Sequence, residues 1–277
     1  VGFDGDDAVA IGHLEIADDP ANPTFAAFEI TTLREDAGLK RTMLARLLDL
    51  AEARGRTELL PWALHTPFES QLWEGLGATL RYTERMSQLV MGDVDADLME
   101  RWILRRTERA AELKLVHWER RCPDRWLTAY SEATNAMNDA PRDDIDFDDR
   151  DYSEDYIRHE EGAWADVGHR LKVLLVVDGA GKPIATTSIF LNLHRPSASW
   201  QGDTVVLEPY RRRGIGRWTK AEMWKRLRAD HPEVTHLETG NAHSNDPMLS
   251  INAEMGYRET HVYAGWQADL DTYRANL

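Results

Sequence analysis

Residues 205–217 read Val-Val-Leu-Glu-Pro-Tyr-Arg-Arg-Arg-Gly-Ile-Gly-Arg, an apolar strand that runs directly into the pattern Arg-x-x-Gly-x-Gly. Gly214 and Gly216 allow a tight turn and a close approach of the backbone to a ligand, because neither carries a Cβ. Apolar residues then recur at 218, 221, 223, 224 and 227, which predicts an amphipathic helix. The stretch therefore predicts a loop at a helix N-terminus, where free amides and the helix dipole favour a bound phosphate.

Arginines surround this predicted loop at positions 211, 212, 213 and 217. Their charge adds to that of the backbone amides, so a pyrophosphate is the expected ligand. Arg-x-x-Gly-x-Gly is short, however, and many unrelated chains contain it. The alternative is a simple strand-to-helix turn with a solvated, arginine-rich face.

The chain after the loop carries a second arrangement with a defined spacing. Residues 234–239 read as a strand. Residues 245–255 then predict a short helix that ends at Gly256. The series of strand, Arg-x-x-Gly-x-Gly loop, helix, strand and Asn-(x)10-Gly-Tyr resembles the GNAT superfamily of acyl-CoA-dependent N-acyltransferases, over roughly residues 171–265.

The resemblance implies an α/β fold with a mixed sheet flanked by helices, and acetyl-CoA as co-substrate. In that family the loop amides hold the CoA pyrophosphate, and the preceding strand splays from its neighbour to admit the pantetheine arm. Backbone amides near Val206 and Leu207 would polarise the thioester carbonyl. The cofactor contacts implied here are Val205, Val206, Leu207, Arg211, Arg212, Arg213, Gly214, Ile215, Gly216, Arg217, Asn245 and Asn252.

The catalytic residues depart from the family pattern. Many GNAT enzymes carry a tyrosine seven residues after the motif asparagine to protonate the leaving thiolate, but this chain has Asn252 there. An amide supplies no proton at neutral pH, so Asn252 is expected to hydrogen-bond the thiolate or the acceptor. Tyr257, Tyr263 and His243 are the alternative acids, and Asp203 is the candidate base, unless it is a solvated strand-edge carboxylate.

An acidic stretch lies upstream, at residues 139–155, where nine carboxylates stand against two arginines. Such runs are often solvated loops. In GNAT enzymes, however, the corresponding segment commonly lines the acceptor side. The resemblance therefore implies that a cationic acceptor, such as a polyamine or an aminosugar, is held by Asp143, Asp144, Asp146 or Asp148.

An internal repeat is indicated by the first part of the chain. Residues 25–54 follow the order strand, loop, helix, and a shift of 176 residues places Gly38 on Gly214 and Lys40 on Gly216. Glu35 and Asp36 stand where arginines would meet a pyrophosphate, so we expect this first copy not to bind CoA.

Two GNAT copies in tandem are therefore the predicted architecture. Residues 1–91 form a degenerate copy that lacks its first strand and helices, residues 92–112 form a linker, and residues 113–277 form the catalytic copy. Because the chain opens abruptly at Val1, we expect the natural polypeptide to begin earlier.

Composition narrows the functional classes. A net charge of −15 disfavours binding to nucleic acid or to an anionic membrane, and a single cysteine fits a reducing cytoplasm. Cys122 precedes Pro123, at a predicted helix start where the thiol pKa can fall, but a structural role is expected because no base is identified. The histidines show no metal-site pattern.

The sequence thus predicts acetyl transfer to a small amine by direct attack. The alternative is a non-catalytic acyl-CoA sensor or assembly protein. Acceptor, acyl length and oligomeric state stay open.

Overall fold

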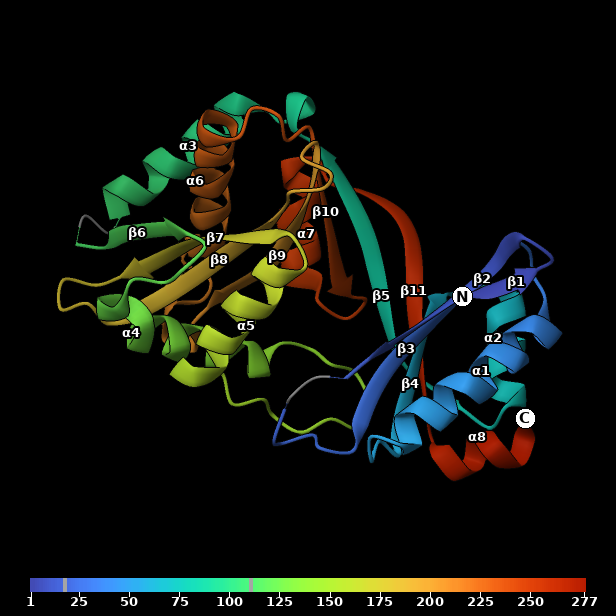
Figure 1. The fold of residues 1–277 in the computed structure, drawn as a ribbon. Helices are drawn as coiled ribbons and strands as arrows, with labels where there is room; N and C mark the ends of the chain where they lie inside the picture. Colours follow the sequence, from blue (N-terminus) through green and yellow to red (C-terminus); the bar gives the residue numbers. More distant parts are fainter. Residues whose placement is uncertain (17–18, 110–111) are drawn as a thin grey trace.

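A computed structural model describes residues 1–16, 19–109 and 112–277. Within these ranges the strands form one eleven-stranded sheet in the order β1-β2-β3-β4-β11-β5-β10-β9-β8-β7-β6 (Figure 1). The strands are β1 (Gly2–Asp4), β2 (Asp7–Glu15), β3 (Phe25–Thr32), β4 (Glu58–Leu64), β5 (Thr79–Val90), β6 (Lys114–Glu119), β7 (His169–Val177), β8 (Pro183–Asn192), β9 (Ala198–Val206), β10 (His236–Ala242) and β11 (Arg258–Asp269). The α-helices are α1 (Ala37–Glu52), α2 (Pro67–Gly75), α3 (Ala96–Arg109), α4 (Asp124–Asn135), α5 (Glu154–Asp166), α6 (Ile215–Asp230), α7 (Asp246–Met255) and α8 (Leu270–Asn276).

The predicted repeat is visible in the order of the elements. The series β3-α1-β4-α2-β5 recurs as β9-α6-β10-α7-β11. In both series a parallel strand pair flanks a long helix, as right-handed crossovers require. The predicted fold class, a mixed sheet flanked by helices, is confirmed.

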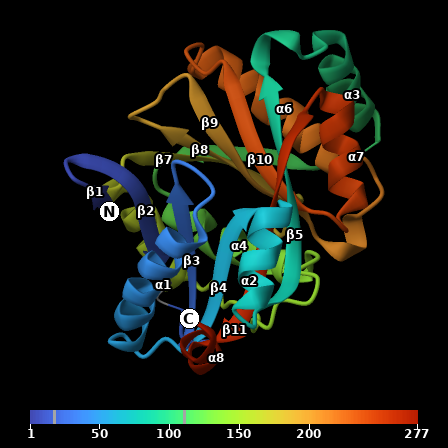
Figure 2. The ribbon, with the colours of Figure 1, turned by 90° about the vertical axis from the view of Figure 1, so that its right-hand side faces the viewer.

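The two halves exchange their last strands. Strand β5, from the first half, pairs antiparallel with β10 of the second half from His236↔Val90 to Ala242↔Glu84. Strand β11, from the second half, lies between β4 and β5 and pairs with both. Figure 2 shows β5 and β11 crossing between the two lobes. The predicted boundaries at residues 91 and 113 stay a prediction, and the sheet runs through both halves without a break.

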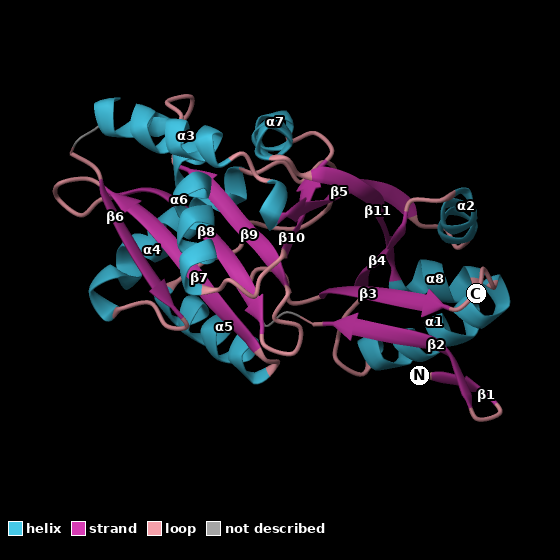
Figure 3. Ribbon diagram, turned by 90° about the horizontal axis from the view of Figure 1, so that it is seen from above, coloured by secondary structure: helices cyan, strands magenta, loops and turns pink. Residues whose placement is uncertain are grey.

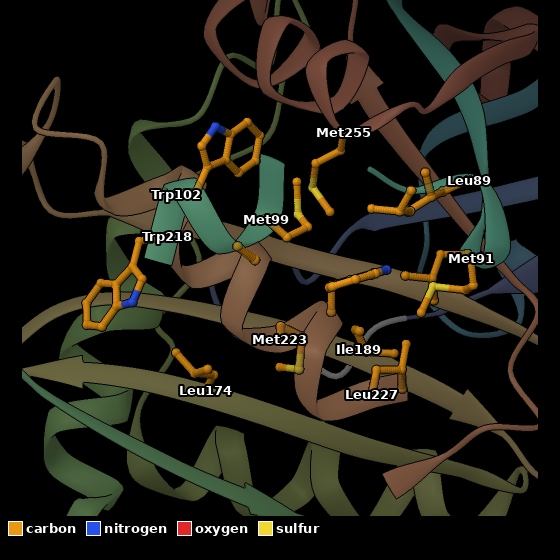
Figure 4. Close-up of a cluster of buried hydrophobic side chains, with 14 of the residues drawn as sticks. Leu89, Met91, Met99, Trp102, Leu174, Ile189, Trp218, Met223, Leu227 and Met255 are labelled. Carbon is orange, nitrogen blue, oxygen red and sulfur yellow. The ribbon is translucent and has the colours of Figure 1, made fainter. Parts of the chain in front are cut away.

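Two of the hydrophobic cores include residues from the other half. The core beneath α6 contains Leu89 from the exchanged β5, together with Met91 and Met99 (Figure 4). The core beneath α1 contains Trp266 and Tyr273 from the C-terminal end of the chain, both fully buried. Separating the halves would expose both sets of side chains, so we expect the halves to unfold together.

The parallel pair β9 and β10 is short. It joins only Ala198–Trp200 to His236–Glu238. Beyond this point β9 keeps its partner β8 as far as Val206, while β10 stays paired with β5. The two strands therefore separate after Trp200, as the resemblance implied.

The acidic stretch forms a strap, residues 140–153, that links the second half to the first. Figure 1 shows it running from the helices of the second half to the base of β3. The side-chain amide of Gln267 on β11 both accepts from the Asp146 backbone N–H (3.0 Å) and donates to the Asp146 carbonyl (3.1 Å). Asn22 makes the same double contact with the backbone of Asp148. The strap is thus fixed mainly through its backbone.

We expect Trp266→Ala to lower the free energy of unfolding by about 3–5 kcal/mol, because it leaves a cavity in the core beneath α1. Chemical denaturation followed by circular dichroism measures the change, and both halves should still unfold in one transition. Trp164→Ala, at a tryptophan 36% exposed on α5, is the matched control with a smaller effect. Two separate transitions in Trp266→Ala would contradict the shared core.

Candidate functional site

The loop before α6 has the backbone of an anion site. Arg212 and Gly214 both have positive φ, 62° and 80°, and Gly214 is the N-cap of α6 with no side chain to satisfy the helix amides. Alternation of left-handed and right-handed residues turns successive N–H groups to one side and creates a nest for an anion. The predicted helix begins at Ile215, directly after this nest.

The arginines around the loop divide into two pairs. Arg211 is held by the Val206 carbonyl (2.8 Å) and by Asp139 (2.7 Å). Arg217 makes a two-pronged ion pair with Glu254 on α7. Arg212 and Arg213 are exposed, and Arg213 lies 5.6 Å over the ring of Tyr210. The first pair braces the loop, and the second pair extends its positive surface.

The first turn of α6 packs against two neighbours at Gly216. A Cβ at Gly216 would lie 3.5 Å from Ile251 on α7 and 3.7 Å from Val206 on β9. The first turn of α6 therefore borders both α7 and the strand that separates from β10. Asn245, the motif asparagine, caps α7 by accepting from the Met248 N–H (3.4 Å).

A buried polar cluster lies one turn further along α6. Lys220 is 2% exposed, and its ammonium lies 5.4 Å over the ring of Tyr257. Asn252 donates to the Asn241 side chain (2.7 Å), but its Oδ1 atom and the hydroxyl of Tyr257 have no hydrogen-bond partner within the described structure. Burial lowers the pKa of Lys220 to about 7 and raises that of Tyr257. Orphaned polar atoms at this depth are unusual and often mark a ligand site.

Asp203 lies on β9 beyond the point where the strands separate. The residue is exposed on the surface, but desolvation by the groups around its carboxyl raises the pKa while Arg150 on the strap lowers it. Tyr130 and Tyr152 are close enough for Asp203 to raise their own pKa values. The candidate base therefore faces the strap.

Solved structures share this architecture, and GCN5-related N-acetyltransferases are among them. No family model matches the chain, and no curated protein does. A tandem GNAT protein from the clavulanic acid biosynthesis pathway aligns with a TM-score of 0.69 at 22% identity, over 88% of this chain and 75% of that one. The chain has a tandem GNAT fold. GCN5-related N-acetyltransferases from Sphaerobacter thermophilus (TM-score 0.64, 12% identity, 96% of this chain and 78% of that one) and Kribbella flavida (0.57, 13%, 87% and 80%) are also similar.

The second GNAT copy fits the CoA group on the features described. The nest before α6 suits a pyrophosphate, Gly216 leaves room beside it, and the separated strands open from the same loop. Val205, Val206 and Leu207 lie at the end of β9, as predicted, and Asn252 lies next to β10.

The first GNAT copy differs at the corresponding loop. Between Leu33 and Lys40 no residue has positive φ, and Asp36 caps α1 with its own carboxylate. Lys40 points inward, where it donates to Glu69 on α2 (2.5 Å) and to the Ile30 carbonyl (2.7 Å). The Leu39 N–H at the start of α1 is thus already hydrogen-bonded to Asp36, and the Lys40 side chain is buried in the core.

The predicted acceptor residues lie on the strap. The Asp143 carboxylate accepts from Ser244 (2.6 Å), and the Asp144 N–H donates to the Arg81 carbonyl (3.1 Å). Asp146 and Asp148 use their backbones for the double contacts described above. Their exposed carboxylates stay candidates for a cation, and the backbone contacts place them next to β5 and β11.

Sequence reasoning missed Glu84 and Lys220. Glu84 lies in a cleft of about 430 Å³ at the centre of the sheet, and burial raises its pKa to about 7. In the sequence, Glu84 is one residue among alternating strand residues in the copy expected to be inert. Lys220 carries a signal, because it follows Gly216 by four residues and shares its helix face.

The remaining findings concern the single cysteine, metal ligands and membrane-spanning helices. Cys122 is buried against Glu161, which raises its thiol pKa to about 12, so the suggestion of a lowered pKa is wrong. Among the described residues no group of three or more potential ligands could hold a metal ion. No helix in the described ranges is long and apolar enough to cross a membrane.

We expect Lys220→Met to flatten the pH dependence of stability. Between pH 7 and pH 10.5 the unfolded chain holds a lysine proton that the folded chain lacks, so the free energy of unfolding rises with pH by up to about 1.4 kcal/mol per unit. The methionine variant should lose this slope and be more stable near pH 7. Urea unfolding at pH 7 and pH 9 measures it, with the exposed Lys225→Met as control. Equal slopes in all three proteins would mean that Lys220 is charged when folded.

Proposed function

We propose that the chain is an acetyl-CoA-dependent N-acetyltransferase. The observation that carries the proposal is the junction between the nest before α6 and the separation of β9 from β10. An anion site alone would suit many phosphates. An anion site that opens onto a gap between two parallel strands suits a long ligand with a pyrophosphate at one end and a reactive group at the other.

In this proposal the exposed Arg212 and Arg213 and the nest amides hold the pyrophosphate. Acetyl-CoA supplies an activated acetyl group. The Leu207 N–H, one of the two amides expected to polarise the thioester, already donates to the Ile184 carbonyl (2.9 Å). The Val206 N–H on β9 is therefore the amide proposed to stabilise negative charge on the thioester oxygen. Asn252 on α7 and Lys220 on α6 are buried polar groups, and they favour stabilisation of a thiolate.

The acceptor is proposed to be a small amine that enters from the side of the strap. The exposed carboxylates of Asp143, Asp144 and Asp146 favour a cationic molecule. Asp203, whose pKa is raised, is one candidate for the group that removes the ammonium proton.

The double variant Arg212→Glu/Arg213→Glu should weaken acetyl-CoA binding at least about 100-fold, because charged hydrogen bonds contribute about 1.5–3 kcal/mol each. Calorimetric titration gives affinity and stoichiometry, and one site per chain is expected. Arg54→Glu/Arg195→Glu makes the same change in net charge at two exposed arginines elsewhere and should bind normally.

Unchanged affinity in the loop variant would sink the assignment of the cradle, and two sites per chain would mean that the first copy also binds CoA. Tight binding of acetyl-CoA without amine-stimulated release of thiol would instead support an acyl-CoA-binding protein without catalysis.

A further inference from the structure

The cleft at the centre of the sheet lies beside the point where β9 and β10 separate. Trp200, the last residue of β9 paired with β10, forms part of its wall. The first half supplies the opposite wall from one sheet face, because Ala26 and Ile30 pack in the core beneath α1 whereas Glu29 lines the cleft. The lining residues are His13, Glu15, Ala27, Phe28, Glu29, Trp62, Glu84, Met86, Trp200 and Tyr263. Figure 3 shows β2 and β3 of the first lobe reaching toward the second.

Glu84 is the carboxylate of this cleft nearest to the separated strands. Its carboxyl group lies directly over Gly240 on β10, where an added Cβ would lie only 2.4 Å from Oε1. Gly240 comes two residues after Glu238, where the pairing of β10 with β9 ends. A glycine at that position is therefore needed for the carboxylate of β5 to reach over β10.

The Glu84 carboxylate has no hydrogen bond or ion pair to another side chain or backbone group that the structure describes. Desolvation alone raises its pKa to about 7. The residue is half-buried and its side chain lines the cleft, so a cation there would meet a carboxylate that no protein group already occupies.

We propose that Glu84 is the proton acceptor for the amine, and that the cleft selects an amine with a second positive charge, held by Glu15 and Glu29 between aromatic walls. The inference rests on the proposed acetyl transfer and names the substrate class and base of that site. Trp62 and Trp200 line the cleft, and aromatic side chains attract organic cations. Glu29 already accepts weakly from the Tyr263 hydroxyl (3.5 Å), and a bound ammonium would compete for it.

Acetyl transfer requires the ammonium group to lose two protons. Glu84 takes one proton from the ammonium and frees the nitrogen lone pair, which attacks the thioester carbonyl. The C–N bond forms, the C–S bond breaks, and the second nitrogen proton passes to the CoA thiolate. Glu84 then returns its proton to solvent. A base with a pKa near 7 suits this exchange at neutral pH.

The groups that face Glu84 come from five elements. Burial of Tyr82, on the same strand, and the charges of Glu84 and Asp143 together raise the pKa of that tyrosine, so all three lie within electrostatic range. The remaining titratable groups around the cleft are His13 and Glu15 on β2, Glu29 on β3, and Tyr263 on β11. With three carboxylates and one histidine in its wall, the cleft favours positive charge.

The test measures thiol release from acetyl-CoA with 1,4-diaminobutane and with 1-aminobutane, which differ by one ammonium group. We expect kcat/KM at least tenfold higher for the diamine, falling with added salt. The acid limb of the pH profile should lie near pH 7. Glu84→Gln should lower kcat by 100-fold or more and remove this limb, and Glu84→Asp should retain the limb. Glu29→Gln should lower kcat/KM for the diamine to near that for 1-aminobutane.

Controls separate this inference from the proposed function. Desulfo-CoA should bind Glu84→Gln as it binds the wild-type protein, which also shows that the variant is folded, and Glu100→Gln on the exposed face of α3 should behave normally in every assay. If Asp203→Asn removes the acid limb and Glu84→Gln does not, or if the diamine has no advantage while CoA binds, the inference is overturned. If the wild-type protein binds no acetyl-CoA, the proposed function itself fails.

Discussion

The reciprocal exchange of β5 and β11 is the interaction on which the rest of the structure depends. Each strand completes the sheet of the other half and adds side chains to its core, Leu89 in one direction and Trp266 in the other. Because β5 pairs with β10 along the whole length of β10, β10 stays fixed on one edge where β9 departs from the other. The opening leaves the edge of β10 that faced β9 without a strand partner beyond Glu238, and the pairing with β5 holds β10 in place there.

The two copies share an element order but differ in the loop that precedes their long helix. The second copy keeps a loop with positive φ residues and an uncapped helix N-terminus, which are costly features unless a ligand uses them. The first copy has satisfied the same positions internally, through Asp36 at the cap and Lys40 against Glu69. What the first copy offers instead is an open sheet face, and that face supplies carboxylates and rings to the central cleft.

Local patterns allowed much of this to be predicted from the sequence. The Arg-x-x-Gly-x-Gly loop, the helix after it and the short helix that ends at Gly256 depend on neighbours within a few residues, and all three lie where predicted. The strand exchange could not be predicted, because pairing partners such as Trp62 and Gly265 are set by packing across most of the chain. Glu84 was missed for the same reason, since its carboxyl group lies over Gly240 on β10, a strand far away in the sequence. The strap was predicted as a source of carboxylates, but its backbone contacts with Asn22 and Gln267 were not.

The position of β11 also governs the order in which the molecule can be assembled. Strand β4 pairs at Trp62 with Gly265 of β11, which the ribosome adds about two hundred residues later. Until Trp266 and Tyr273 emerge, the face of α1 has no lid and β4 has a bare edge, which is the kind of surface that recruits chaperones or aggregates. Synthesis rate and the supply of chaperones should therefore affect the yield of this protein more than they affect a single GNAT domain, whose sheet closes from one contiguous segment.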